Sequence, residues 1–110
     1  MKKNTNHRTL HAEISLIPIG TGSTSISKEV TFAFDAIRKT DGIKATHLTA
    51  MGTQIEANSM MAIFNAIDAA HQAFKSAGIK RIVSNIKISE RLDASKTLEA
   101  EVGSVTEKLT

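Results

Sequence analysis

This sequence of 110 residues has no cysteine, no tryptophan and no tyrosine, and it has only four phenylalanines and one proline. Without cysteine it cannot form a disulfide scaffold, a zinc site with cysteine ligands or a thiol nucleophile. The aromatic content of 4% disfavours functions that need stacked rings, such as an aromatic cage for a cation or a base-stacking surface. These absences exclude the disulfide-rich and thiol-dependent classes of protein.

Long apolar runs are also missing. No segment approaches the roughly 20 apolar residues that span a bilayer. Near the N-terminus, Glu13 and Ser15 interrupt the apolar residues, so no signal-peptide core is predicted. We expect a soluble, cytoplasmic protein without a membrane partner. The net charge of +3 is typical of an ordinary, slightly basic surface, and no basic stripe indicates a nucleic-acid partner.

The composition that remains is that of a small globular protein. Hydrophobic residues make up 41% and charged residues 23% of the chain, and 110 residues suit one hydrophobic core. Residues 1–9 are polar and predict a flexible N-terminal arm, and residues 10–110 predict a single domain.

Alternating and helical spacings of apolar residues predict four strands and three helices. The predicted elements are strands at 10–19, 43–49, 53–56 and 79–89, a helix capped by Ser25 or Ser27 that stops at Gly42, a helix capped by Asn58 or Ser59 that stops at Gly78, and a short C-terminal helix capped by Ser95.

The order β-α-β-β-α-β consists of two βαβ halves. Right-handed crossovers in both halves produce an α+β, ferredoxin-like sandwich, with a four-stranded antiparallel sheet and both main helices on one face. The residues predicted to form the core are Ile14, Leu16, Val30, Phe34, Ile37, Met60, Ile63, Phe64, Ile67, Ile82 and Ile86. Substitution of Phe64 by Ala is then expected to cost about 3–5 kcal/mol of stability.

The second face of the sheet is predicted to lack helical cover. The side chains expected there are Glu13, Ser15, Ile17, Gln54, Glu56, Val83, Asn85 and Lys87. This mixture is too apolar for a purely solvated face and too polar for a dry core. It indicates a face that packs on another subunit, encloses a ligand, or does both. We therefore expect a homodimer or homotetramer.

The segment Gly20–Ser25 lies between a strand and a helix, where phosphate-binding loops occur. It has neither the third glycine of a dinucleotide fingerprint nor the Gly-Lys-Ser/Thr of a P-loop. Two interpretations stay open: a structural turn that needs two flexible residues, or backbone N–H groups that bind an anionic ligand group together with Ser23, Thr24 and Ser25.

Other candidate chemistry is sparse. The four histidines, His7, His11, His47 and His71, show no metal-ligand spacing, and we predict neither a metal site nor a cofactor. Glu13 and Glu56 could share the open face of the sheet, but no nucleophile accompanies them as acid–base catalysis would require. Two other roles stay open for these carboxylates: pairing with Lys87 or Lys44, or binding a cationic ligand. An enzyme would have to use Glu13, Glu56 or His47 for acid–base chemistry, and we predict no catalytic residues. All four phenylalanines fall on helices, which argues against a sheet that binds RNA.

Four segments together resemble the family of small thiamine-binding proteins of ferredoxin-like fold. They are Pro18–Ser27, Met51–Glu56, Gly78–Val83 and Ile86–Arg91, and the resemblance runs from about Ala12 to Leu109. The chain departs from the family pattern at Ala57, where the family usually has glycine. The resemblance implies homo-oligomers, often tetramers with facing sheets, that bind thiamine or its hydroxymethylpyrimidine part without catalysis.

A thiamine site needs a carboxylate for the thiazolium cation, polar partners for the aminopyrimidine, and apolar walls. This chain can supply Glu56 as the carboxylate, with Glu13 as the alternative. The polar candidates are Ser23, Ser25, Thr53 and Asn85, and the wall candidates are Ile17, Leu48 and Met51. We expect this pocket at the open sheet face or a subunit interface. The alternatives are an oligomer without a small ligand, and a phosphorylated ligand at the Gly20–Ser25 turn.

Overall fold

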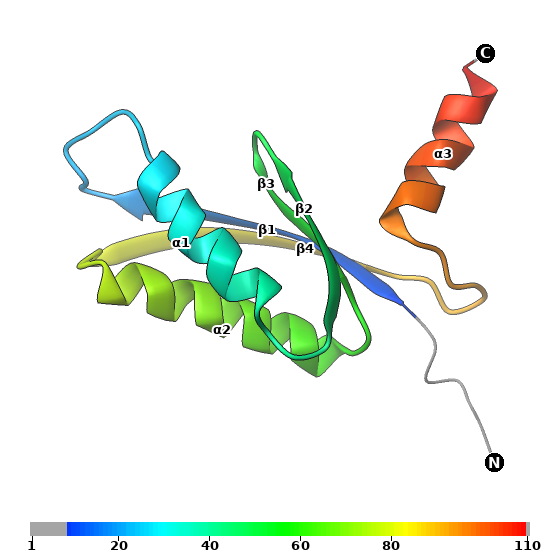
Figure 1. Cartoon of the computed structure of the whole chain (residues 1–110), viewed down its shortest axis with the longest axis horizontal. Coiled ribbons are helices and arrows are strands. Elements are labelled where there is room, and N and C mark those ends of the chain that lie inside the picture. The colour runs from blue at the N-terminus through cyan, green and yellow to red at the C-terminus, as the bar shows by residue number, and fades with distance from the viewer. Residues whose placement is uncertain (1–8, 110) are drawn as a thin grey trace.

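The computed structural model describes residues 9–109, which form four strands and three helices (Figure 1). The elements are β1 (Leu10–Ile19), α1 (Ser27–Arg38), β2 (Ile43–Thr49), β3 (Gly52–Ala57), α2 (Met60–Ser76), β4 (Arg81–Glu90) and α3 (Leu98–Lys108). The predicted arm, residues 1–9, lies outside the described residues except for Thr9. The backbone N–H of Thr9 donates a hydrogen bond of 2.9 Å to Ser95 Oγ.

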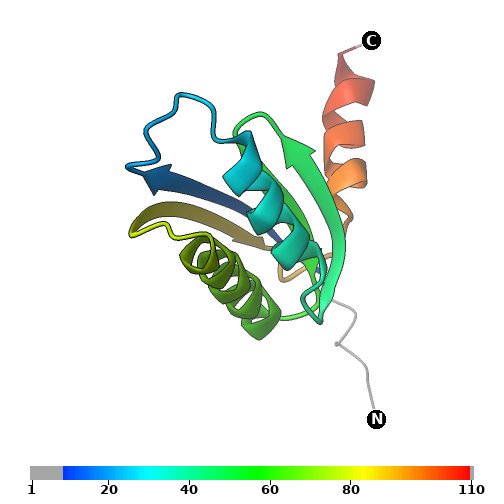
Figure 2. The same ribbon diagram turned by 60° about the vertical axis from the view of Figure 1, so that its left-hand side comes forward.

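The four strands form one antiparallel sheet in the order β2-β3-β1-β4. The helices α1 and α2 lie side by side on one face of this sheet, and α3 stands apart from them (Figure 2). The predicted α+β, ferredoxin-like fold is therefore confirmed.

The core lies between the sheet and the two main helices. On β1, alternate residues from Leu10 to Leu16 are buried, and they pack with Ile37 of α1 and with Ile63 and Phe74 of α2. The alternation of β1 explains this arrangement, because every second side chain of a strand faces the same side.

The prediction that Phe64 belongs to the core was wrong, since 50% of this residue is exposed whereas Phe74 is fully buried. The buried stripe of α2 is centred on alanines. Its members are Ala62, Ile63, Ala66, Ala70 and Phe74. Small alanines allow α2 to approach the sheet closely, and Phe64, one helical step of about 100° from Ile63, lies at the edge of the contact.

The helix caps agree with the predictions only for α2, where Ser59 Oγ accepts a hydrogen bond of 3.1 Å from the N–H of Ala62. Helix α1 begins after Ile26 without a side-chain cap, because Ser25 Oγ lies 3.3 Å from Ser27 Oγ instead of bonding to the helix. Helix α3 is capped by Thr97. Ser95, the predicted cap, accepts a bond from Thr9.

Helix α3 has no buried residue and is attached through polar contacts near its start. His11 Nε2 lies 2.6 Å from the carbonyl oxygen of Lys96, in the segment that leads to this helix. The apolar side chains of Val102 and Val105 are 63% and 60% exposed. The described part of the chain therefore leaves these two valines largely uncovered. No helix within residues 9–109 has the length and apolar character needed to cross a membrane.

Candidate binding site

The two central strands of the sheet have different lengths, and this difference creates an opening. Strand β1 pairs with β4 along its whole length, from Leu10 to Ile19. Its register with β3 covers only Leu10 to Ile14, because β3 begins at Gly52. The second half of β1 therefore has a neighbouring strand on one side only. On the other side lies the turn that joins β2 and β3.

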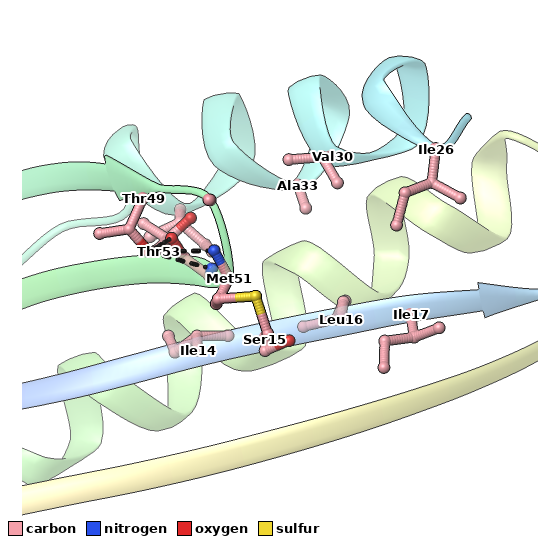
Figure 3. A pocket seen from close by; sticks show the side chains of 13 residues that line it. Ile14, Ser15, Leu16, Ile17, Ile26, Val30, Ala33, Thr49, Met51 and Thr53 are labelled. Atoms are coloured by element: carbon pink, nitrogen blue, oxygen red, sulfur yellow. Dashed lines mark hydrogen bonds between the residues drawn. The ribbon is translucent and has the colours of Figure 1, made fainter. Parts of the chain in front are cut away.

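A cavity of about 240 Å³ lies in this opening, between β1, the β2–β3 turn and α1 (Figure 3). Apolar side chains of β1, of α1 and of the residue before α1 form its walls: Ile14, Leu16, Ile17, Ile26, Val30, Ala33 and Ile37. Three hydroxyl-bearing residues, Ser15, Thr49 and Thr53, complete the lining with the turn residues Ala50, Met51 and Gly52. The cavity is thus an apolar space with a few hydroxyls.

The β2–β3 turn is held by the side chain of Thr49. Its Oγ1 accepts hydrogen bonds from the N–H groups of Met51 (3.3 Å) and Gly52 (3.1 Å), and it donates one to the carbonyl of Gly52 (2.9 Å). The Met51 side chain extends from this turn toward Ser15 on β1 (Figure 3). A flexible thioether at this place can adapt its packing to an occupant of the cavity.

Three of the eight residues predicted for the site line this cavity: Ile17, Met51 and Thr53. Ser23 and Ser25 lie in the loop just before Ile26, and Ser23 Oγ accepts a hydrogen bond of 3.1 Å from Ser25 N–H. Leu48 pairs with Thr53 across the hairpin and is exposed.

The two other predicted site residues lie elsewhere. Glu56 is 7% exposed, and its Oε2 accepts a hydrogen bond of 2.6 Å from the N–H of Leu98, the first residue of α3. Asn85 pairs with Ser15 across the β1–β4 ladder, on the open face of the sheet. Within residues 9–109, neither of the two is part of the cavity lining.

Two residues of the α1 wall, Val30 and Ile37, were predicted to belong to the core. They have the helical spacing of core residues, and this spacing cannot distinguish a packed core from a cavity wall. One feature of the sequence could have revealed the opening, namely the lengths of the predicted strands. The strand at 10–19 is much longer than the one at 53–56. Two antiparallel neighbours of such unequal length must leave an unpaired edge.

The open face of the sheet has the predicted mixed character. The register places Glu13 between Gln54 of β3 and Lys87 of β4, and Gln54 Nε2 lies 3.4 Å from Glu13 Oε2. A second cavity of about 340 Å³ lies between this face and α3. Its lining consists of His11, Ala12, Glu13, Gln54, Lys87, Ser89, Leu98, Glu101 and Val102.

Glu13, which lines the second cavity, also lies close to the first one. A Cβ atom placed on Gly52, a lining residue, would lie 3.5 Å from Glu13 Cγ and 3.4 Å from Ser15 Cβ. The first cavity therefore lies near an acidic side chain on the sheet face opposite α1 and α2. The prediction that this face lacks helical cover was wrong in part, because the start of α3 lies over Glu56 and Glu13.

The electrostatic perturbations lie in surface ion pairs outside both cavities. Hydrogen bonds from Lys39 and Arg38 lower the pKa of Asp35, and a hydrogen bond from Arg91 lowers the pKa of Asp93. Within residues 9–109, no group of three or more His, Asp or Glu side chains could hold a metal ion.

The chain matches the family model described as thiamine-binding protein over residues 12–106. It is 39% identical to the UPF0045 protein of Methanothermobacter thermautotrophicus over 98 residues, which cover 89% of this chain and 97% of that one. It is 35% identical to the UPF0045 protein YqgV of Bacillus subtilis, with 89% and 95% coverage.

Solved structures share the fold. A hypothetical protein of Methanocaldococcus jannaschii has a TM-score of 0.77 at 34% identity, covering 91% of this chain and 98% of that one. A Thermotoga maritima protein, described as a proposed thiamine biosynthesis or salvage protein, has a TM-score of 0.70 at 17% identity, with 88% and 98% coverage. At that identity the likeness shows the fold alone. The family match and the relatives above 30% identity establish that this chain belongs to the thiamine-binding protein family.

Proposed function

We propose that this protein binds thiamine, or its hydroxymethylpyrimidine part, without transforming it. The family match and the name of the Thermotoga maritima neighbour support a thiamine-related ligand. The observation that carries the proposal is the cavity between β1, α1 and the β2–β3 turn, which combines apolar walls with hydroxyls and lies close to the acidic side chain of Glu13.

The aminopyrimidine ring occupies the apolar part of this cavity. Binding sites that enclose a whole drug-sized ligand measure about 300–1,000 Å³, so a cavity of about 240 Å³ suits one ring and leaves the rest of thiamine outside. Leu16 and Val30 supply aliphatic walls, and the hydroxyls of Ser15 and Thr53 can both donate and accept hydrogen bonds. Ser23 and Ser25 lie in the loop beside the wall residue Ile26, and Leu48 lies beside Thr49.

The thiazolium cation lies outside the cavity, on the open sheet face, next to Glu13. Glu13 is preferred to Glu56 as its partner because the carboxylate of Glu56 is buried and accepts the N–H of Leu98 at 2.6 Å, whereas Glu13 accepts a longer hydrogen bond of 3.4 Å from Gln54. A charge-assisted contact with a carboxylate stabilises a cation more than a neutral hydrogen bond does. Asn85, which pairs with Ser15 on the same face, is a second polar partner for this part of the ligand.

Binding without catalysis agrees with the chemistry of the lining. The residues that line the cavity, within the described range 9–109, include no carboxylate, histidine or lysine. General acid–base catalysis needs such a titratable group within hydrogen-bond reach of the reacting atom. Neither a catalytic residue nor a cofactor is part of the proposal, and a cytoplasmic location stays a prediction.

The protein is further proposed to act as a homodimer or homotetramer. The exposed valines of α3 and the half-apolar open face of the sheet are the surfaces that a second copy would cover. Closed symmetric assembly is the usual way to bury such surfaces. The open-face end of the ligand site would then lie at or near a subunit interface.

Calorimetric titration with thiamine, hydroxymethylpyrimidine, thiamine diphosphate and a nucleotide tests the function. We expect binding of the first two, and at least a tenfold loss of affinity in Ala33→Phe, which fills the cavity from α1. Thr31→Phe, on the exposed side of the same helix, is the matched control and should bind normally. Absence of heat with every ligand would favour a purely structural oligomer. Preference for phosphorylated ligands, unchanged in Ala33→Phe, would favour the Gly20–Ser25 turn.

A further inference from the structure

The edge of β1 next to the cavity bears backbone groups that the sheet does not use. In an antiparallel strand, the N–H and C=O of one residue point to the same side, and successive residues alternate between sides. The carbonyl oxygen of Ile14 points toward β3, because it would lie 3.1 Å from a Cβ atom on Gly52. Two residues later, Leu16 must point to the same side, where β3 has already ended.

Pro18 supports the same orientation independently. It lies opposite Ile82 in the ladder between β1 and β4. Because proline has no N–H to donate, it is tolerated where the backbone of the strand faces away from its neighbour. Residues 14, 16 and 18 therefore all direct their backbone groups away from β4. Among residues 9–109, no hydrogen bond joins the backbone of Leu16 to the β2–β3 turn.

We propose that the free backbone edge at Leu16 selects the ligand by pairing its N–H and C=O with the edge of an aminopyrimidine. This inference rests on the proposed function and specifies how the cavity recognises the ring. A 4-aminopyrimidine has an amino donor next to a ring-nitrogen acceptor. The extended Leu16 backbone offers an acceptor next to a donor, which is the complementary pair.

The backbone of Leu16 has a fixed pattern of donor and acceptor, whereas the polar side chains of the lining do not. Hydroxyls such as those of Ser15 and Thr53 rotate, so each can act as donor or acceptor and discriminates poorly between ring edges. A backbone N–H can only donate and a C=O can only accept. Because an unpaired buried polar group is costly, a ligand with the wrong pattern is strongly disfavoured.

Oxythiamine, which has an oxygen in place of the amino group, is the discriminating ligand. Its ring presents an acceptor and a donor in the reversed order, so both contacts to Leu16 become repulsive in the same pose. We expect oxythiamine to bind at least about 100-fold more weakly than thiamine, as expected for a site built around specific hydrogen bonds. If thiamine and oxythiamine bound with equal affinity, and Ala33→Phe still weakened thiamine binding, this inference would be overturned but the proposed function would stand. If the wild-type protein did not bind thiamine at all, the proposed function itself would be contradicted.

Two further measurements separate backbone from side-chain recognition. In Thr53→Val, which keeps the shape but removes the hydroxyl, the ratio of the thiamine and oxythiamine affinities should stay within about threefold of the wild-type ratio. In ¹⁵N-labelled protein, saturating thiamine should shift the amide signal of Leu16 and slow its hydrogen exchange. The amide of Ile17, which faces β4, serves as the control. Collapse of the affinity ratio in Thr53→Val, or an unchanged Leu16 amide, would contradict the inference.

Discussion

The carboxylate of Glu56 on β3 accepts a hydrogen bond of 2.6 Å from the backbone N–H of Leu98, 42 residues further along the chain. Leu98 is the first residue of α3, and its N–H has no partner within the helix. A carboxylate also interacts favourably with the positive end of the helix dipole. This contact ties the start of α3 to the open face of the sheet.

Substitution of Glu56 by Ala is therefore expected to release α3 rather than the ligand. The loss of a hydrogen bond to a charged group should cost about 1.5–3 kcal/mol of stability in this region. Hydrogen exchange of the α3 amides measures the effect. The affinity for thiamine, measured by titration, should change less than threefold. A large loss of affinity with unchanged α3 exchange would restore Glu56 as the ligand carboxylate.

Glu13→Gln tests the carboxylate that is proposed to lie next to the thiazolium cation. The variant keeps the shape and the hydrogen-bonding capacity but removes the charge next to the thiazolium. We expect thiamine binding to weaken by about 1.5–3 kcal/mol, or roughly 10–150-fold. Binding of neutral hydroxymethylpyrimidine should be nearly unchanged. A parallel loss for both ligands would show that Glu13 has no role specific to the cation.

Phe74→Ala and Phe64→Ala form a matched pair on α2. Phe74 is fully buried in the core, so its truncation should cost about 3–5 kcal/mol. Phe64 is half-exposed at the edge of the helix contact, and its truncation should cost less than about 1 kcal/mol. Urea denaturation monitored by circular dichroism compares the two. Equal losses would mean that both rings are packed in the native protein, contrary to the burial seen here.

Gly42→Ala and Gly78→Ala separate backbone strain from steric conflict. Both glycines have positive φ, +89° and +86°. At Gly78 an added methyl group meets no atom within 4 Å, so only the left-handed conformation is penalised, by about 1–2 kcal/mol.

At Gly42 an added Cβ would lie 2.7 Å from Ala62 Cβ and 2.9 Å from Asn58 Oδ1. Overpacking of this kind adds about 1–3 kcal/mol, so Gly42→Ala should be the more destabilised variant in thermal melts. If the two melting temperatures agreed, the contact between the α1–β2 turn and the start of α2 would be looser than described.

Val102→Glu combined with Val105→Glu tests the role of α3 in assembly. Both valines are mostly exposed in the single chain, so the fold of one subunit should tolerate the charges. A stable interface would not, because buried unpaired charges are strongly unfavourable. Light scattering should then report a monomer for the variant and a dimer or tetramer for the wild type. A wild-type monomer at micromolar concentration would remove the proposal of self-association.

Local patterns in the sequence were sufficient for most of the fold. Right-handed crossovers in the two βαβ halves place both main helices on one face of the sheet. The alternation along residues 10–19 determined which face of β1 is buried, and the helical spacing determined which side of α1 and α2 is apolar. These are short-range properties with periods of two residues for strands and 3.6 for helices, so one segment is enough to display them.

Tertiary structure alone decided the rest. The burial of Phe74 but not Phe64 depends on how closely an alanine-rich face of α2 approaches the sheet, and the partner of Glu56 depends on where α3 begins. The cavity exists because β1 extends beyond the end of β3, which leaves the backbone of Leu16 facing an opening instead of a strand. Such features depend on distances between segments that are remote in the chain, and the spacing of residues within one segment contains no information about them.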